Sequence, residues 1–308
     1  MQSKLKNGYL GLCLGDALLA PYERKKNYIY TGKLDQELIS RSRWQGTKNF
    51  PAGSMTDDTA MTTALILSII NNKSWNKEKI ILEYLNFAND EYMSRFMGSN
   101  TRSLFKGIKT IKGYESRFEK MNDKENNQSN GSLMRIFGIN FLYCFGFDQE
   151  YVFNVALNDT ILTNPSIVNR DATLVYLQCC YLSLNDIEPN IDDIVAQTEP
   201  IKQVLYEIKN NIERKVDGKD KGWVCHSLYI ALWAWLRQDW DLDKTFKYIA
   251  EKGGDTDTNG AITGALVGLR LKSNLDSQEE NINILLSSNS NYSYSPKIGL
   301  ELINKLDL

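Results

Sequence analysis

Residues 253–268 read GGDTDTNGAITGALVG, and we expect this stretch to decide how the chain folds. Its first two glycines permit a sharp turn. Asp255 and Asp257 then stand where a helix begins, a place that favours carboxylates. Further glycines follow at intervals of four residues, which puts them on one face of that helix. Because a glycine face lets two helix backbones approach closely, we expect the acidic turn to be held rigidly in the interior.

A second acidic turn opens another apolar helix far upstream. Thr56, Asp57 and Asp58 come shortly before the apolar run of residues 60–70. Helix capping explains one acidic residue at either turn, and it remains the alternative reading of each turn alone. A second buried carboxylate beside the first is repulsive, so the two turns would need a cation if they converged. The chain has a single histidine, and oxygen ligands favour Mg²⁺ or Mn²⁺ over zinc.

The composition is that of an ordinary globular protein. Of its 308 residues, 42% are hydrophobic and 24% are charged, without a break along the chain, so we expect one domain over residues 1–308. A net charge of -2 gives no reason to expect general nucleic-acid binding. Asp16 interrupts the N-terminal apolar run, and no run reaches the ~18 apolar residues of a membrane span. Five cysteines without C-x-x-C spacing indicate reduced thiols and a cytoplasmic location.

Helical periodicity dominates the chain and predicts an all-α fold. We expect helices over residues 5–20, 60–70, 74–89, 100–111, 136–147, 148–158, 170–184, 192–211, 223–237 and 297–305. Pro21 should end the first of them. Residues 24–53 have little periodicity, and long irregular connections in a compact domain are often functional. We therefore expect residues 22–53 to form a loop or flap that carries Glu23, and residues 121–130 to form an exposed loop.

Four stretches together resemble one known family. In chain order they are GLCLGDALLAPYE, GSMTDDTAMTTAL, SNGSLMRIFGI and GGDTDTNGAITGALVG, within residues 11–268. They resemble the ADP-ribosylglycohydrolase family, the relatives of dinitrogenase reductase-activating glycohydrolase. The resemblance implies an all-α domain with two divalent cations, Mg²⁺ or Mn²⁺, at buried helix N-termini. It also implies hydrolysis of the glycosidic bond between ADP-ribose and an acceptor. The implied metal ligands are Thr56, Asp57, Asp58, Asp255, Asp257 and Thr258.

The resemblance also assigns catalytic and ligand-binding residues. Glu23 matches an acidic residue that serves some branches of the family as a metal-associated catalytic or gating carboxylate, and Asp57 and Asp257 are the metal-bound candidates for catalysis. A further segment matches a loop that contacts the diphosphate of ADP-ribose, and a turn capped by its asparagine is an equally open reading. Backbone amides at a helix start suit a phosphate. The segment consists of Ser129, Asn130, Gly131 and Ser132.

Two positions depart from the family pattern. Asn164 stands where the family commonly has a histidine that contacts adenosine, and Phe96 stands where several members have an aspartate linked to arginine specificity. The expected partner is an ADP-ribosylated protein, with ADP-ribose as product and the acceptor residue open. The alternatives are a catalytically inactive member of the fold that binds ADP-ribose or is structural, and a metal-dependent phosphohydrolase. Intact ligand-type residues in both turns favour activity.

Overall fold

The computed structural model describes residues 1–23, 29–35, 51–91, 93–121, 126–271, 275–288 and 291–306. Within these ranges the chain is built from α-helices and short 3₁₀-helices. The β-type pairing in them is an isolated antiparallel bridge between Ser129 and Trp223. The prediction of an all-α fold is therefore confirmed.

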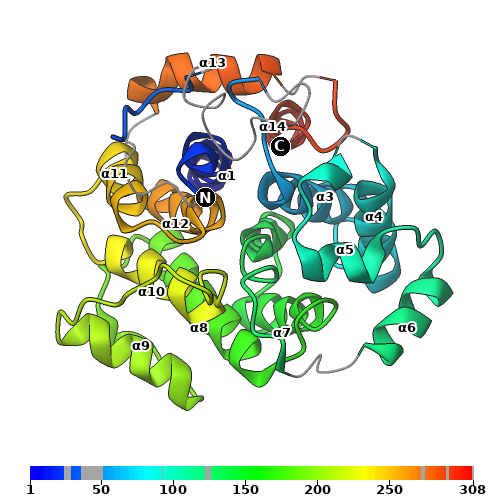
Figure 1. The fold of residues 1–308 in the computed structure, drawn as a ribbon, viewed down its shortest axis with the longest axis horizontal. Coiled ribbons are helices and arrows are strands. Elements are labelled where there is room, and N and C mark those ends of the chain that lie inside the picture. The colour runs from blue at the N-terminus through cyan, green and yellow to red at the C-terminus, as the bar shows by residue number, and fades with distance from the viewer. Residues whose placement is uncertain are drawn as a thin grey trace.

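The helices follow the order of the chain and are labelled in Figure 1. The α-helices are α1 Gln2–Leu19, α3 Asp57–Asn72, α4 Lys77–Asn89, α5 Ser99–Phe105, α6 Ile111–Lys120, α7 Gln149–Thr160, α8 Ile167–Leu184, α9 Glu199–Lys209, α10 Val224–Trp235, α11 Leu242–Lys252, α12 Thr256–Arg270, α13 Glu279–Ser288 and α14 Pro296–Asn304. The 3₁₀-helices are η1 Ala20–Tyr22, η3 Met93–Arg95, η5 Ile136–Phe145, η6 Ile191–Asp193 and η7 Asp276–Gln278.

Helices α1 and α12 lie side by side (Figure 1). Their glycines face each other. A Cβ added to Gly15 would collide with the carbonyl oxygen of Gly260, and one added to Gly11 would collide with that of Gly264. Nearly every residue of α12 is buried. The expectation that the glycine face presses against a neighbouring helix is confirmed, and the acidic turn before α12 is fixed to the core.

Pro21 ends α1 as expected. The helix stops at Leu19 and continues as the 3₁₀-helix η1, which contains the proline. Glu23 follows η1 directly, and 1% of its surface is exposed. Most of the predicted flap, residues 24–28 and 36–50, lies outside the described residues. Residues 29–35 are irregular and lie against the helical core, where the Leu34 N–H donates to the side-chain oxygen of Asn281 on α13.

Several predicted helix boundaries were wrong. The apolar run at residues 136–147 forms the 3₁₀-helix η5, and hydrophobic runs cannot distinguish the two helix types. The helix predicted at 100–111 is split, because the chain is extended at Lys106 and left-handed at Gly107. Helix α9 begins later than predicted, since the N–H groups preceding it bind the carboxylate of Asp171. Helices α6, α11 and α13 were not predicted.

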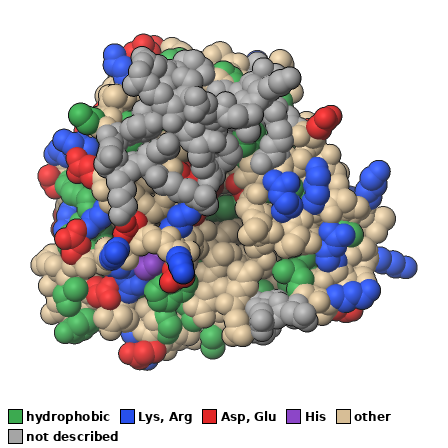
Figure 2. Space-filling view, viewed as in Figure 1, with side chains coloured by type: hydrophobic (Ala, Val, Ile, Leu, Met, Phe, Trp, Pro, Cys, Tyr) green, Lys and Arg blue, Asp and Glu red, His purple; other side chains and the backbone are tan. Residues whose placement is uncertain are grey.

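The surface carries charges of both signs. Figure 2 shows Lys and Arg side chains gathered over the side formed by α4, α5 and α6, and mixed charges over the opposite side. This pattern agrees with the small net charge of the chain. None of the described helices has the length and apolar character needed to cross a membrane.

Candidate active site

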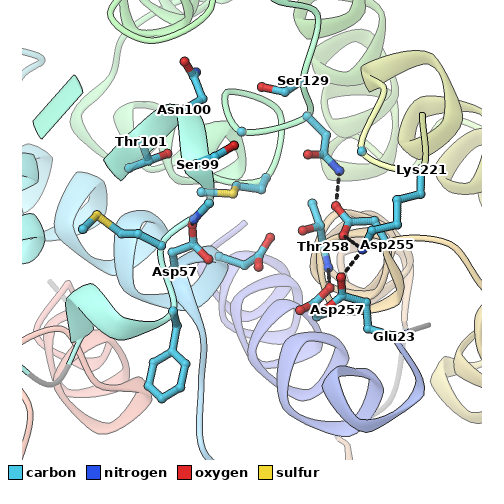
Figure 3. Close-up of a pocket in the computed structure, with 18 residues that line it drawn as sticks. Glu23, Asp57, Ser99, Asn100, Thr101, Ser129, Lys221, Asp255, Asp257 and Thr258 are labelled. Atoms are coloured by element: carbon cyan, nitrogen blue, oxygen red, sulfur yellow. Dashed lines mark hydrogen bonds and ion pairs between the residues drawn. The ribbon is translucent and has the colours of Figure 1, made fainter. Parts of the chain in front are cut away.

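A cavity of about 420 Å³ brings the two acidic turns together. Figure 3 shows Asp57 on one side of it, and Asp255, Asp257 and Glu23 on the other. The residues that line the cavity are Glu23, Asp57, Asp58, Phe96, Met97, Gly98, Ser99, Asn100, Thr101, Ser129, Asn130, Gly131, Met134, Lys221, Gly222, Asp255, Asp257 and Thr258. The folded chain therefore gathers at one place the acids that the sequence keeps far apart.

The turn before α3 is capped by a carboxylate from another helix. Thr56 is the N-cap residue, and its side chain makes no capping hydrogen bond. Instead, Asp16 on α1 accepts the backbone N–H of Thr56 at 3.0 Å and that of Thr59 at 3.1 Å. Its oxygens also accept the hydroxyls of both threonines. Because Asp16 satisfies the helix N-terminus, Asp57 and Asp58 are not needed as caps.

Asp57 and Asp58 have different surroundings. Asp57 accepts the N–H of Gly98 at 2.9 Å, which ties the wall at residues 97–101 to α3. One Asp58 oxygen accepts the Thr56 hydroxyl at 2.8 Å. The other oxygen, Oδ1, is buried, and no described residue forms a hydrogen bond with it. A buried carboxylate oxygen without a hydrogen bond is costly unless a proton or a cation compensates it.

Burial and mutual repulsion disfavour the charged form of these acids. Burial raises the pKa of Asp57 to about 7, and the negative charge of Asp16 adds to the shift. Burial also raises the pKa of Asp58 well above its usual range, with Asp16, Asp57 and Asp257 contributing repulsion. The pKa of Asp16 is raised by burial and lowered by its bonds to Thr59 and Thr56. Burial and repulsion therefore favour the protonated forms of Asp57 and Asp58.

The turn before α12 contributes a second group of oxygens. Asp255 is the N-cap residue of α12 and makes no side-chain capping hydrogen bond. Asp257 accepts the N–H of Thr258 at 3.0 Å, and both line the cavity. Carboxylate oxygens of Glu23, Asp255 and Asp257 lie within 4.8 Å of one another, close enough to share one ion. The Thr256 hydroxyl donates to the carbonyl of Leu19, so α12 is pinned to the end of α1.

Two side chains hold the Asp255 carboxylate in place. The Asn130 amide donates to Asp255 Oδ2 at 2.8 Å, and the Lys221 ammonium pairs with Asp255 Oδ1 at 3.1 Å. Lys221 also forms an ion pair with Glu23. Figure 3 marks these contacts with dashed lines around Asp255, Lys221 and Glu23. The carboxylate of Asp255 is therefore fixed by a neutral donor on one oxygen and a cation on the other.

The predicted ligand-binding segment reaches the cavity in part. Ser129, Asn130 and Gly131 line it, whereas Ser132 is fully buried and accepts a hydrogen bond from Asn169. The buried guanidinium of Arg135 fixes the segment from behind, because it donates to the carbonyl of Gly131 at 2.7 Å.

Arg135 is itself fixed by a fully buried ion pair with Asp159, at 2.9 Å. Its Nε also donates to the hydroxyl of Tyr84. Breaking a buried pair of this kind is strongly destabilising, so the segment has a rigid support.

A sequence model of the ADP-ribosylglycohydrolase family matches residues 1–275. The chain belongs to this family. A protein of Acanthamoeba polyphaga mimivirus described as an ADP-ribosyl glycohydrolase is 23% identical over 297 residues, which cover 87% of this chain and 87% of that protein. Among solved structures, a chain of an "ADP-ribosylglycohydrolase-related protein complex" has the same fold, with a TM-score of 0.72 at 18% identity, over 100% of this chain and 99% of that chain.

Membership in the ADP-ribosylglycohydrolase family supports a glycohydrolase that acts on ADP-ribosylated substrates. The family is generally metal-dependent, and the residues of this chain fit a divalent cation. The donors are oxygens throughout, as hard cations require. Three of the carboxylates approach one another closely enough for an ion, and Asp58 has a buried oxygen that no described residue contacts by hydrogen bonding. Thr56 fits less directly, since it is absent from the cavity lining and its hydroxyl contacts Asp16 and Asp58.

The two departures from the ADP-ribosylglycohydrolase pattern lie in different places. Asn164 is fully buried, and its amide donates to the Ser129 hydroxyl at 2.9 Å. It therefore supports the ligand-binding segment and does not line the cavity. Phe96 does line the cavity, beside Met97 and Gly98.

Two residues at the site escaped the sequence-based prediction of functional residues. Asp16 gave a signal, because a carboxylate within an apolar helix run is costly and needs partners. Lys221 gave none, since it is one of several lysines in a polar stretch. On helix α10, Trp235 is fully buried, and its indole donates to Ser183. His226 lies against the ring of Trp223, outside the cavity lining.

Proposed function

We propose that this chain is a metal-dependent ADP-ribosylhydrolase that releases ADP-ribose from a modified protein side chain. The observation that carries the proposal is the convergence of both acidic turns and residues 129–131 in one cavity. A capping role alone gives no reason for this convergence, because Asp16 caps α3 and Asp255 makes no capping bond. Two divalent cations, Mg²⁺ or Mn²⁺, would balance the acids. Their proposed ligands are Thr56, Asp57, Asp58, Asp255, Asp257 and Thr258.

Different residues of the cavity are proposed to bind the substrate and to transfer protons. When bound, divalent cations polarise the scissile bond and lower the pKa of water. Residues 129–131 are the candidates for holding the diphosphate, with the Gly131 N–H as the donor, because those of Ser129 and Asn130 already donate to Asn127 and Gly222. Glu23, Asp57 and Asp257 line the cavity and are the candidates for accepting a proton from water. The buried support from Arg135 keeps the ligand-binding segment in place while the bond breaks.

The test is release of ADP-ribose from defined linkages. The protein is incubated with arginine-, serine- and nucleic-acid-linked ADP-ribose, with Mg²⁺, with Mn²⁺ and with a chelator. We expect release from one protein linkage, dependent on the ion. Release from the nucleic acid alone would redirect the proposal to another acceptor. Binding of ADP-ribose without release from any linkage would favour an inactive member of the fold, and release of phosphate from a nucleotide would favour a phosphohydrolase.

We also propose that residues 1–308 act as one domain in a reducing, cytoplasmic environment. All five cysteines are free thiols, and four of them are buried. Burial raises the pKa of the thiols, which keeps them protonated and unreactive. Helices from both ends of the chain, α1 and α12, pack on each other in the core, which supports a single cooperative unit. A single unfolding transition by calorimetry and by circular dichroism is the expected result.

A further inference from the structure

Lys221 lies between two acidic residues of the cavity. Its ammonium pairs with Glu23 and with Asp255. These are two of the three residues whose carboxylate oxygens lie within 4.8 Å of one another. Among the described residues that line the cavity, Lys221 is the one Lys or Arg. Its side chain is 19% exposed, against 2% for Glu23 and 17% for Asp255, so these ion pairs are poorly screened by water.

The loop that carries Lys221 is bonded through its backbone to residues 128–130. The carbonyl of Gly222 accepts the N–H of Asn130 at 2.9 Å, and the N–H of Val224 donates to Gln128 at the same distance. Ser129 and Trp223 form the isolated bridge between these bonds. The backbone that presents Lys221 is therefore anchored, while the long side chain is held by its two ion pairs.

From this geometry we infer that Lys221 is an internal cation that competes with the metal. In the metal-free protein its ammonium offsets one of the two negative charges of Glu23 and Asp255, and a divalent ion that uses these oxygens must displace it. The inference deepens the proposed function, because it concerns how the same site takes up its ion. A fixed positive charge beside the ion position repels the ion as well as competing for its ligands. Lys221 thus weakens metal binding while it stabilises the metal-free fold.

The experiment compares wild type with Lys221→Gln by calorimetric titration of Mg²⁺ and Mn²⁺, and by thermal unfolding in chelator. We expect Lys221→Gln to bind one or both ions about tenfold more tightly, because the competing charge is gone. In chelator the same variant should melt below wild type, since two partly buried ion pairs are lost. Added metal should then raise its melting temperature more than that of wild type.

Two variants serve as controls. Lys221→Arg keeps the charge and should bind metal as wild type does. Lys219→Gln removes the same charge from the same loop but outside the cavity lining, and should change neither affinity nor melting temperature. Lys221→Gln binding metal no more tightly than wild type would overturn the inference and leave the proposed metal site intact. Absence of metal binding in wild type and in Lys221→Gln would overturn both.

Discussion

Asp16 Oδ2 accepts the backbone N–H of Thr59 at 3.1 Å, so a carboxylate on α1 caps the N-terminus of α3. The two residues belong to different helices, and their contact fixes how the first acidic turn faces the end of α1. In most helices the capping oxygen comes from the N-cap residue itself. The cap here is a tertiary contact, and the orientation of Asp57 and Asp58 depends on it.

Replacing Asp16 should destabilise the whole protein. Asp16→Ala leaves the N–H groups of Thr56 and Thr59 without their buried acceptor, and we expect a loss of about 3 to 5 kcal/mol in unfolding free energy. Asp16→Asn keeps one oxygen and should lose less. Urea denaturation measures both. Asp239→Ala, which removes an exposed carboxylate paired with Lys244, is the control and should change little.

Adding one methyl group between α1 and α12 should be just as damaging. The Cβ of Gly15→Ala would collide with the carbonyl oxygen of Gly260, which is backbone and cannot rotate away. We expect about 3 kcal/mol of destabilisation, in the range of overpacked cores. Ser3→Ala alters an exposed position of the same helix and serves as the comparison. Equal stability of Gly15→Ala and wild type would show that the two helices can separate without cost.

The metal-free protein should lose stability as the pH rises. Burial raises the pKa of Asp57 to about 7, above that of an unfolded aspartate. Between about pH 4 and 7 the folded state therefore holds a proton that the unfolded state has released. Melting temperatures in chelator should fall over this range, and saturating Mg²⁺ should reduce the fall. Asp57→Asn should be less sensitive to pH than wild type, and an unchanged pH profile in that variant would contradict the assignment.

Asp257→Asn should separate catalysis from folding. The Asn carbonyl can still accept the N–H of Thr258, so the helix start keeps its hydrogen bond. One negative charge is nevertheless lost from the cavity. Release of ADP-ribose from the correct substrate should fall by at least ~10²-fold with little change in melting temperature, as when an electrostatic stabiliser is removed. Asp192→Asn, at an exposed position, should keep full activity.

The sequence predicted those parts of the fold and site that have a local signature. The doubled acids at residues 57–58, and the alternation of Asp and Thr at 255–258, mark helix starts that exceed the needs of capping, and both turns do line one cavity. The glycine spacing predicted a close helix pair because any side chain at Gly260 or Gly264 would collide with α1. Pro21 marked the end of α1 by its own geometry.

Other features depend on contacts that no local pattern encodes. Lys221 meets Glu23 only because the loop before α10 is bonded to residues 128–130. Asn164, which stands where the family commonly has a histidine, supports Ser129 from a buried position. The 3₁₀ geometry of η5 has no signal in its apolar run, which suits either kind of helix. These are tertiary effects, and they decide the details of the site.

The last turns of α1 set the relative positions of the two acidic turns. Asp16 binds the start of α3, while three residues later the carbonyl of Leu19 binds Thr256 at the start of α12. One inserted or deleted residue between Gly11 and Asp16 would rotate the end of the helix by about 100° relative to the glycine contacts. Both acidic turns would then lose their contacts with the end of α1. The interval from Gly11 to Leu19 must therefore keep its length if both acidic turns are to face the same cavity.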